Sequence, residues 1–166
     1  MASYTFPSNS QGWDEAVMPW TIADGSPSLG CLRGAGGGSF STGLSELSIP
    51  VAVDDPISCR VRFTAAEDAN PGTLRARLRA QELGGDLADI IEERSVLTLP
   101  YDSGWFIVSG VFTGTGTVDA LAFNALAVEA ETTFDVAFDF VYVAEAPPGG
   151  FTFTRSAGGV PGAVAI

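Results

Sequence analysis

Residues 57–81, ISCRVRFTAAEDANPGTLRARLRAQ, decide the fold. In 57–66 and again in 73–81, apolar side chains alternate with polar or cationic ones, which is the period-two pattern of a strand with one buried face. Helix is the competing interpretation of 73–81, because Leu, Arg, Ala and Gln all favour helices. Its apolar residues would spread around a helical wheel, however, so we favour a strand. The cationic positions on the two strands are Arg60, Arg62, Arg75, Arg77 and Arg79.

The turn-like residues 67–72 suggest that these two strands form one hairpin. In that pairing Arg62 faces Arg77, and the hairpin gathers positive charge on one patch. Like charges directly opposite one another cost about 0.2–1 kcal/mol per pair. We therefore expect something acidic over the patch, either an acidic neighbour or an anionic glycan that guanidinium groups bind bidentately. The alternative is neutralisation within the sheet by acids on adjacent strands: Asp135, Asp139, Glu129, Glu131 or Glu46.

The composition favours one all-β domain. With 166 residues, 46% of them hydrophobic and 17% charged, the chain can bury an adequate core. Twenty glycines and ten prolines, placed between short apolar runs, indicate many turns. We expect a jelly-roll β-sandwich of about 8–10 strands, with a short helix or turn at 86–94. The expected strands are 4–6, 20–23, 28–33, 39–47, 57–66, 73–81, 95–99, 105–113, 120–128 and 133–143.

Two of these strands carry unusual apolar surface. In 133–143 one face is expected to be aromatic and buried in the core. Its members are Phe134, Val136, Phe138, Phe140 and Tyr142. The strand 105–113 is apolar on both faces, so its second face is expected to meet either a loop of this chain or another subunit.

The sandwich is expected to span residues 1–146 and to be followed by a Pro/Gly hinge and an extended C-terminal arm, 147–166. The sequence PPGG at 147–150 cannot continue a central strand. Beyond it the chain is small, apolar and almost uncharged, and such a tail would be mobile in isolation. We expect it to lie on a neighbouring subunit; folding back on its own domain is the alternative. The interface residues expected in the arm are Phe151, Phe153, Arg155, Val160 and Ile166.

Charge and termini limit the partners and the location. A net charge of −12 disfavours binding to nucleic acid or to an anionic membrane surface. No apolar run approaches the ~20 residues that span a bilayer. The amino terminus lacks a basic region followed by an apolar core, so we expect no secretory signal and synthesis in the cytoplasm. In that reducing compartment Cys31 and Cys59 are expected to be buried thiols rather than a disulfide.

The composition also removes several kinds of active site. Without histidine there is no Ser-His-Asp or Cys-His pair, and without lysine there is no Schiff base and no Walker loop. Two distant cysteines do not make a zinc site. Twenty acidic residues leave carboxylate-pair catalysis open, but spacing identifies no pair. We predict no enzyme, no catalytic residue and no metal ligand.

Four aromatic residues next to turns are candidates for stacking on a sugar, because loops carry binding functions more often than cores do. They are Trp13, Trp20, Tyr101 and Trp105. The competing interpretation of each is packing against the core, which is the commoner role of a tryptophan beside an apolar strand.

Three stretches resemble jelly-roll carbohydrate-binding modules and galactose-binding-like β-sandwiches: YTFPSNSQGW at 4–13, DGSPSLGCLR at 24–33 and FDFVYV at 138–143. The resemblance covers about residues 4–144 and implies a β-sandwich that binds a glycan. Asp139 matches the acidic position in the last strand of that family. The resemblance also allows a structural calcium ion near the amino-terminal loops, but no ligand spacing supports one, so we predict no cofactor.

The same fold is similar to that of accessory proteins on bacteriophage virions, which are made without signals and often carry extended arms. Our leading hypothesis is therefore a non-catalytic virion protein, a capsid decoration or tail-associated subunit, that packs against its own copies and other virion proteins. The alternative is a carbohydrate-binding module that holds a glycan with Trp13 or Trp20 and the arginines.

Overall fold

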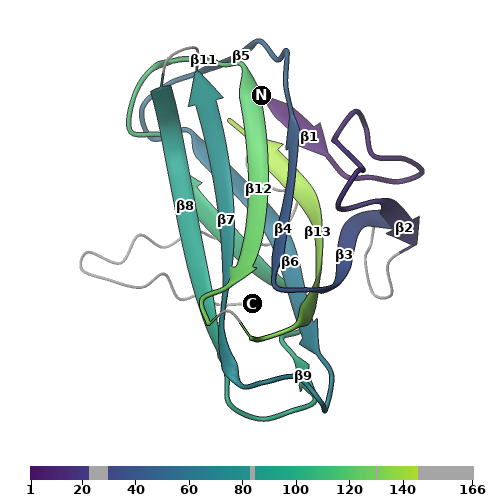
Figure 1. Cartoon of the computed structure of the whole chain (residues 1–166). Helices are drawn as coiled ribbons and strands as arrows, with labels where there is room; N and C mark the ends of the chain where they lie inside the picture. The colour runs from purple at the N-terminus through teal and green to yellow at the C-terminus, as the bar shows by residue number, and fades with distance from the viewer. Residues whose placement is uncertain (23–29, 83–84, 130, 146–166) are drawn as a thin grey trace, which may run out of the picture.

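The structure is a computed structural model that describes residues 1–22, 30–82, 85–129 and 131–145. Its strands are β1 Ala2–Tyr4, β2 Trp20–Ile22, β3 Gly30–Gly37, β4 Ser39–Leu44, β5 Ile49–Val51, β6 Pro56–Ala65, β7 Gly72–Glu82, β8 Gly85–Val96, β9 Tyr101–Asp102, β10 Phe106–Val111, β11 Gly116–Val118, β12 Ala120–Ala127 and β13 Phe134–Val143. Eleven of them form two antiparallel sheets packed face to face, and the other two pair separately (Figure 1). This arrangement confirms the predicted all-β sandwich.

The two sheets are named here from the view in Figure 1. The front sheet has the strand order β4-β12-β7-β8. The back sheet has the order β10-β6-β13-β3-β2, with β1 beside β13 and β9 beside β6. The short strands β5 and β11 pair with each other.

The core fills the space between the sheets with alternate side chains of facing strands. The buried residues of β6 are Ile57, Cys59, Val61, Phe63 and Ala65, as the alternation predicts. Those of β7 are Leu74, Ala76, Leu78 and Ala80. Removing this apolar surface from water, at about 25 cal/mol per Å², is the main force that holds the two sheets together.

The two arginine strands do not form the predicted hairpin. In the back sheet β6 pairs with β13 and β10, whereas β7 pairs with β12 and β8 in the front sheet. Residues 66–71 therefore cross from one sheet to the other. Because the apolar residues of both strands point inward, the arginines of β6 and those of β7 lie on opposite outer faces. The expected single positive patch is wrong, and each sheet instead sets arginines opposite acids, as at Arg60 and Asp139.

Residues 86–94, for which we expected a helix or turn, lie inside β8. Their pairing with β7 places Asp89 opposite Arg79 and Glu93 opposite Arg75. The guanidinium of Arg79 lies 3.0 Å from Asp89, and the Nε atom of Arg75 donates to Glu93 at 2.7 Å. Cross-strand pairs of opposite charge stabilise a sheet, and this pairing overrides the local helix propensity. Of the expected strand 95–99, the first two residues end β8.

A β-bulge interrupts the aromatic face that we predicted for β13. The register against β6 shifts between Asp139 and Tyr142, and Phe140 has a φ of 51°. The buried apolar and aromatic residues before the bulge are Phe134, Val136 and Phe138, and those after it are Val141, Tyr142 and Val143. Phe140 lies instead against the outward-facing Arg60, 4.6 Å from the guanidinium carbon to the ring centre. Its predicted place in the core is therefore wrong.

The remaining differences concern short elements and the end of the chain. The sequence did not predict β5, β9 and β11. The predicted arm 147–166, with Phe151, Phe153, Arg155, Val160 and Ile166, lies outside the described residues. In the part of the chain that the structure describes, no helix has the length and apolarity needed to cross a membrane.

Candidate functional site

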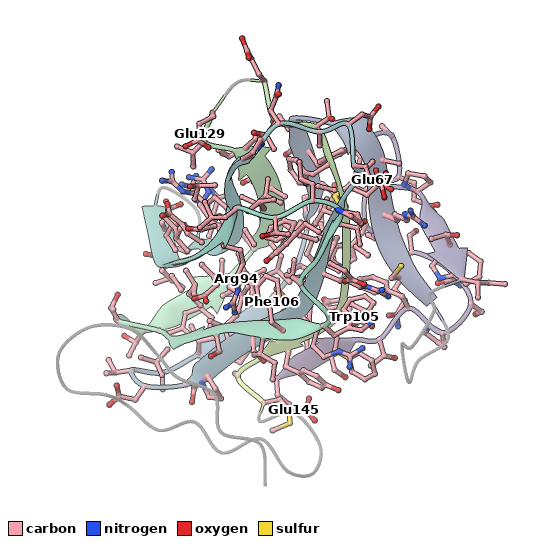
Figure 2. The ribbon with its side chains drawn as sticks, turned by 90° about the horizontal axis from the view of Figure 1, so that it is seen from below. Glu67, Arg94, Trp105, Phe106, Glu129 and Glu145 are labelled. Atoms are coloured by element: carbon pink, nitrogen blue, oxygen red, sulfur yellow. The ribbon has the colours of Figure 1, made fainter. Side chains whose placement is uncertain are left out.

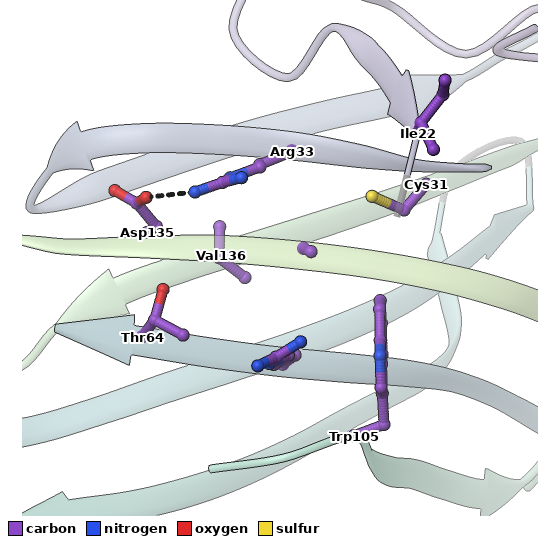
Figure 3. A pocket seen from close by; sticks show the side chains of 9 residues that line it. Ile22, Cys31, Arg33, Thr64, Trp105, Asp135 and Val136 are labelled. Carbon is purple, nitrogen blue, oxygen red and sulfur yellow. Dashed lines mark hydrogen bonds and ion pairs between the residues drawn. The ribbon is translucent and has the colours of Figure 1, made fainter. Parts of the chain in front are cut away.

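An open depression on the outer face of the back sheet is the candidate site. Its volume is about 310 Å³, at the lower end of the range of small-molecule sites. The residues that line it are Ile22, Cys31, Arg33, Arg62, Thr64, Trp105, Asp135, Val136 and Ala137. They come from β2, β3, β6 and β13 and from the residue before β10 (Figure 3). Adjacent strands that are distant in sequence thus build one surface.

An ion pair between β3 and β13 forms one end of the depression. The Arg33 guanidinium lies 2.7 Å from Asp135 Oδ2 (Figure 3). The other carboxylate oxygen of Asp135 accepts a hydrogen bond from the backbone N–H of Gly36 at 2.8 Å. The Arg33 side chain is 51% exposed and that of Asp135 is 29% exposed. The pair therefore offers hydrogen-bond donors and acceptors to a ligand in a fixed orientation.

A second ion pair joins β6 to β9 beside the depression. Arg62 Nε donates to Asp102 Oδ1 at 2.9 Å, and a terminal guanidinium nitrogen donates to Asp102 Oδ2. The backbone N–H of Gly104 also donates to Asp102 Oδ1, at 2.9 Å. The hydrogen bond from Arg62 is the main cause that lowers the pKa of Asp102 below its ordinary value. The carboxylate therefore stays charged at neutral pH and holds Arg62 in its bidentate geometry.

Trp105 is the aromatic side chain of the depression. Figure 3 shows its indole edge-on among the side chains that line the depression, which include Thr64 and Asp135. Arg60 lies over the ring at 4.8 Å from the ring centre. Arg60 also makes a bidentate pair with Asp139, through Nε at 2.9 Å and a terminal nitrogen at 2.8 Å. With Phe140 on the other contact of Arg60, a cation, two rings and a buried carboxylate meet on one sheet face.

The start of β10, directly after Trp105, is held from the other sheet. Figure 2 shows Arg94 of β8 beside Phe106. The guanidinium carbon of Arg94 lies 4.3 Å from the centre of that ring. Such cation–π contacts contribute about 0.5–2 kcal/mol, depending on exposure. The contact thus fixes the backbone next to the indole.

Both cysteines are free and buried, as predicted. Burial, aided by the negative charge of Asp139, raises the pKa of Cys31 to about 11. The same two causes raise the pKa of Cys59 further. Cys31 lines the depression but is a protonated thiol at neutral pH, so it is no nucleophile there.

Ellman's reagent should therefore leave both thiols unmodified in the native protein at about pH 8, close to the ordinary pKa of a thiol. After unfolding in concentrated guanidinium chloride, both should react within minutes, since the unfolded chain restores exposure and ordinary acidity. The measurement is the absorbance of the released thiolate in native and unfolded samples. Rapid reaction of one thiol in the native protein would contradict the burial of Cys31 or Cys59.

The structure separates the four aromatic candidates. Trp13 is 2% exposed and packs edge-on against Phe138, so its ring offers no face to a ligand. Trp20 is half-buried, and its Nε1 donates to the carbonyl oxygen of Phe6 at 2.9 Å. Tyr101 is half-buried against the core, and burial raises its pKa. Of the four, only Trp105 is among the described residues that line the depression.

The predicted arginines divide between the two outer faces. Arg62 lines the depression and Arg60 lies next to it, whereas the arginines of β7 lie on the front sheet. There Arg77 donates to Asn124 at 3.1 Å, and its neighbours pair with acids of β8. Their predicted role as an interface or anion site stays a prediction. Among the described residues, no group of three or more acidic or cysteine side chains is arranged to bind a metal.

Sequence reasoning missed Arg33 and Asp135 as a site pair. Asp135 was proposed only as a neutralising acid, and Arg33 was not considered. Nothing local signals the pair, because it depends on β3 lying beside β13. Both residues occupy outward-facing positions of strands whose side chains alternate between the two faces. This position is the one sequence signal that could have found them.

The comparisons with known proteins show the fold. No protein-family model matches the sequence, and no curated protein sequence matches it. The chain is similar to CBM28, a carbohydrate-binding module specific for non-crystalline cellulose, with a TM-score of 0.61, 14% identity and coverage of 84% of this chain and 91% of that one. It is also similar to TmCBM27, a module with specific mannan recognition (TM-score 0.57, 12% identity, coverage 86% and 95%). A third is CBM27-1 of Caldicellulosiruptor saccharolyticus, solved with mannohexaose (TM-score 0.56, 11% identity, coverage 84% and 94%).

These three structures are carbohydrate-binding β-sandwiches, so the predicted jelly-roll fold is confirmed. The resemblance inferred from the sequence is confirmed at the level of the fold. At these identities the likeness establishes no ligand for this chain.

Proposed function

We propose that this protein binds a neutral polysaccharide in the depression on the outer face of the back sheet, without catalysing a reaction. The observation that carries the proposal is the placement of the Trp105 ring and the Arg33–Asp135 pair at the same depression. A sugar ring presents apolar C–H faces that pack on an aromatic ring, and hydroxyl groups that bond to charged donors and acceptors. The similar structures, described as binding cellulose or mannan, support the same class of ligand.

The balance of charge favours a neutral glycan over the anionic one considered from the sequence. Each arginine at the site already has a carboxylate partner: Arg33 has Asp135, Arg60 has Asp139 and Arg62 has Asp102. Three positive and three negative charges cancel. An anionic sugar would gain no net attraction here, and the net charge of −12 on the chain would repel it.

Calorimetric titration of the protein with soluble mannan, xylan, cello-oligosaccharides and polygalacturonate tests the proposal. We expect binding to at least one neutral polymer and none to polygalacturonate. Trp105→Ala should weaken that binding by tenfold or more, because loss of a central aromatic contact typically costs about 2 kcal/mol. Trp105→Phe, which keeps a smaller ring, should weaken it less.

Asn124→Ala is the matched control, because Asn124 lies on the front sheet, where it contacts Arg77 and Ser41. It should bind as the wild type does. Unchanged affinity in Trp105→Ala, or binding only to polygalacturonate, would contradict the proposed site and ligand.

The virion hypothesis stays a prediction. It rested on the predicted arm, which lies outside the described residues, on the expected lack of a secretory signal, and on the strand 105–113, whose second apolar face was expected to meet a loop of this chain or another subunit. No contact among the described residues favours a homo-oligomer or a virion partner over glycan binding.

A further inference from the structure

We infer that Arg60 is a positioning residue that holds the Trp105 indole in its orientation at the depression, and that Asp139 and Phe140 keep Arg60 in place. The effect on glycan affinity rests on the proposed function. The effect on the indole itself does not, because it follows from contacts within the protein.

Arg60 contacts two aromatic rings at once. The Arg60 guanidinium carbon lies 4.8 Å from the centre of the Trp105 ring and 4.6 Å from that of Phe140. One planar cation therefore contacts two aromatic rings, a geometry that suits guanidinium because it stacks on ring faces. Trp105 is among the described residues that line the depression and Arg60 is not. Arg60 thus contacts the indole from outside the set of residues that line the depression.

The buried carboxylate of Asp139 anchors the Arg60 cation. Asp139 is 0% exposed and accepts two hydrogen bonds from Arg60, while the Arg60 side chain is 17% exposed. A buried carboxylate is costly unless it is paired, so the pair fixes the position of the guanidinium. Surface pairs such as Arg75 with Glu93, whose side chains are 36% and 47% exposed, lack this constraint.

An irregular backbone in β13 brings Phe140 to Arg60. The bulge in β13 turns Phe140 out of the core, and its φ of 51° is unusual for a bulky residue. Such strain costs about 1–3 kcal/mol and is maintained where the surroundings require it. Phe140, the strained residue, provides the second ring that contacts Arg60. This contact accounts for the bulge in addition to the packing of the sheet.

The environment of the Trp105 indole can be measured directly by NMR. The chain has three tryptophans, so a ¹⁵N spectrum of the full protein should show three indole N–H peaks, of which Trp105→Phe identifies one. Arg60→Lys keeps the charge opposite Asp139 but loses the planar stacking. We expect it to shift and broaden the Trp105 peak and to leave the peaks of Trp13 and Trp20 in place. Affinity for the best neutral polysaccharide should fall about threefold to tenfold.

Phe140→Leu is the second variant, which removes the outer ring and keeps the ion pair, so the test survives if Arg60→Lys does not fold. Arg75→Lys is the matched control on the front sheet and should change neither the Trp105 peak nor affinity. An unmoved Trp105 peak in both Arg60→Lys and Phe140→Leu would overturn the inference. A moved peak in a protein whose wild type binds no polysaccharide would support the positioning of the indole and reject the proposed function.

Discussion

Asp139→Asn is expected to lower the free energy of unfolding by about 3–5 kcal/mol. Asp139 is fully buried, and both of its carboxylate oxygens accept hydrogen bonds from Arg60. Asparagine has nearly the same shape but can accept at only one atom, and its amide nitrogen would face a guanidinium donor. The substitution therefore leaves a largely buried positive charge without its counter-charge. Urea unfolding, followed by circular dichroism, measures the loss.

Asp102→Asn is the control for this prediction. It makes the same substitution in the pair with Arg62, whose side chains are 31% and 48% exposed. Exposed ion pairs typically contribute about 0–1 kcal/mol, so the expected loss is several times smaller. Equal losses in the two variants would show that the burial of Asp139 has no energetic consequence and would contradict the structure.

The alternation of single strands was predictable from the sequence, because it depends only on local pattern. In β6 and β7 every predicted apolar position is buried. The pairing of Arg60 with Asp139 was also one of the predicted ways to neutralise the arginines. These predictions succeeded for one reason. In a strand with one buried face, every second residue points to the same side, so the alternation of apolar and polar residues shows which side chains are buried.

The pairing of strands was not predictable in the same way. The turn-like residues 67–72 are compatible with a hairpin, yet the chain crosses there between sheets. The choice depends on the stability of β6 with β13 and of β7 with β12, which are contacts between distant parts of the chain. The depression depends on the same long-range pairing. Trp105 and Arg62 were therefore identified from the sequence as candidate site residues, but their proximity to Arg33 and Asp135 was not predicted.

The alternating sequence of β13 gives no sign of the bulge, and mutation can test whether the bulge is present. The sequence FDVAFDFVYV at 134–143 keeps a period of two, so it places Phe138 and Phe140 on the same buried face. The structure places Phe138 in the core, stacked on Phe123 with ring centres 4.3 Å apart, and Phe140 on the outer face over Arg60. The two interpretations predict different energies for the same truncation.

Phe138→Ala should lower the free energy of unfolding by about 3–5 kcal/mol, because it opens a cavity among rigidly packed rings. Phe138 contacts Phe6 and Trp13 edge-on in addition to Phe123, with ring centres 5.6 and 5.2 Å away. Phe140→Ala leaves no such cavity and removes one cation–π contact, so we expect a loss of about 1 kcal/mol. Urea midpoints of the two variants give the comparison. Losses of similar size would indicate that both rings lie in the core, as the uninterrupted alternation predicts. They would contradict the bulge and the outward Phe140, on which the positioning of Arg60 depends.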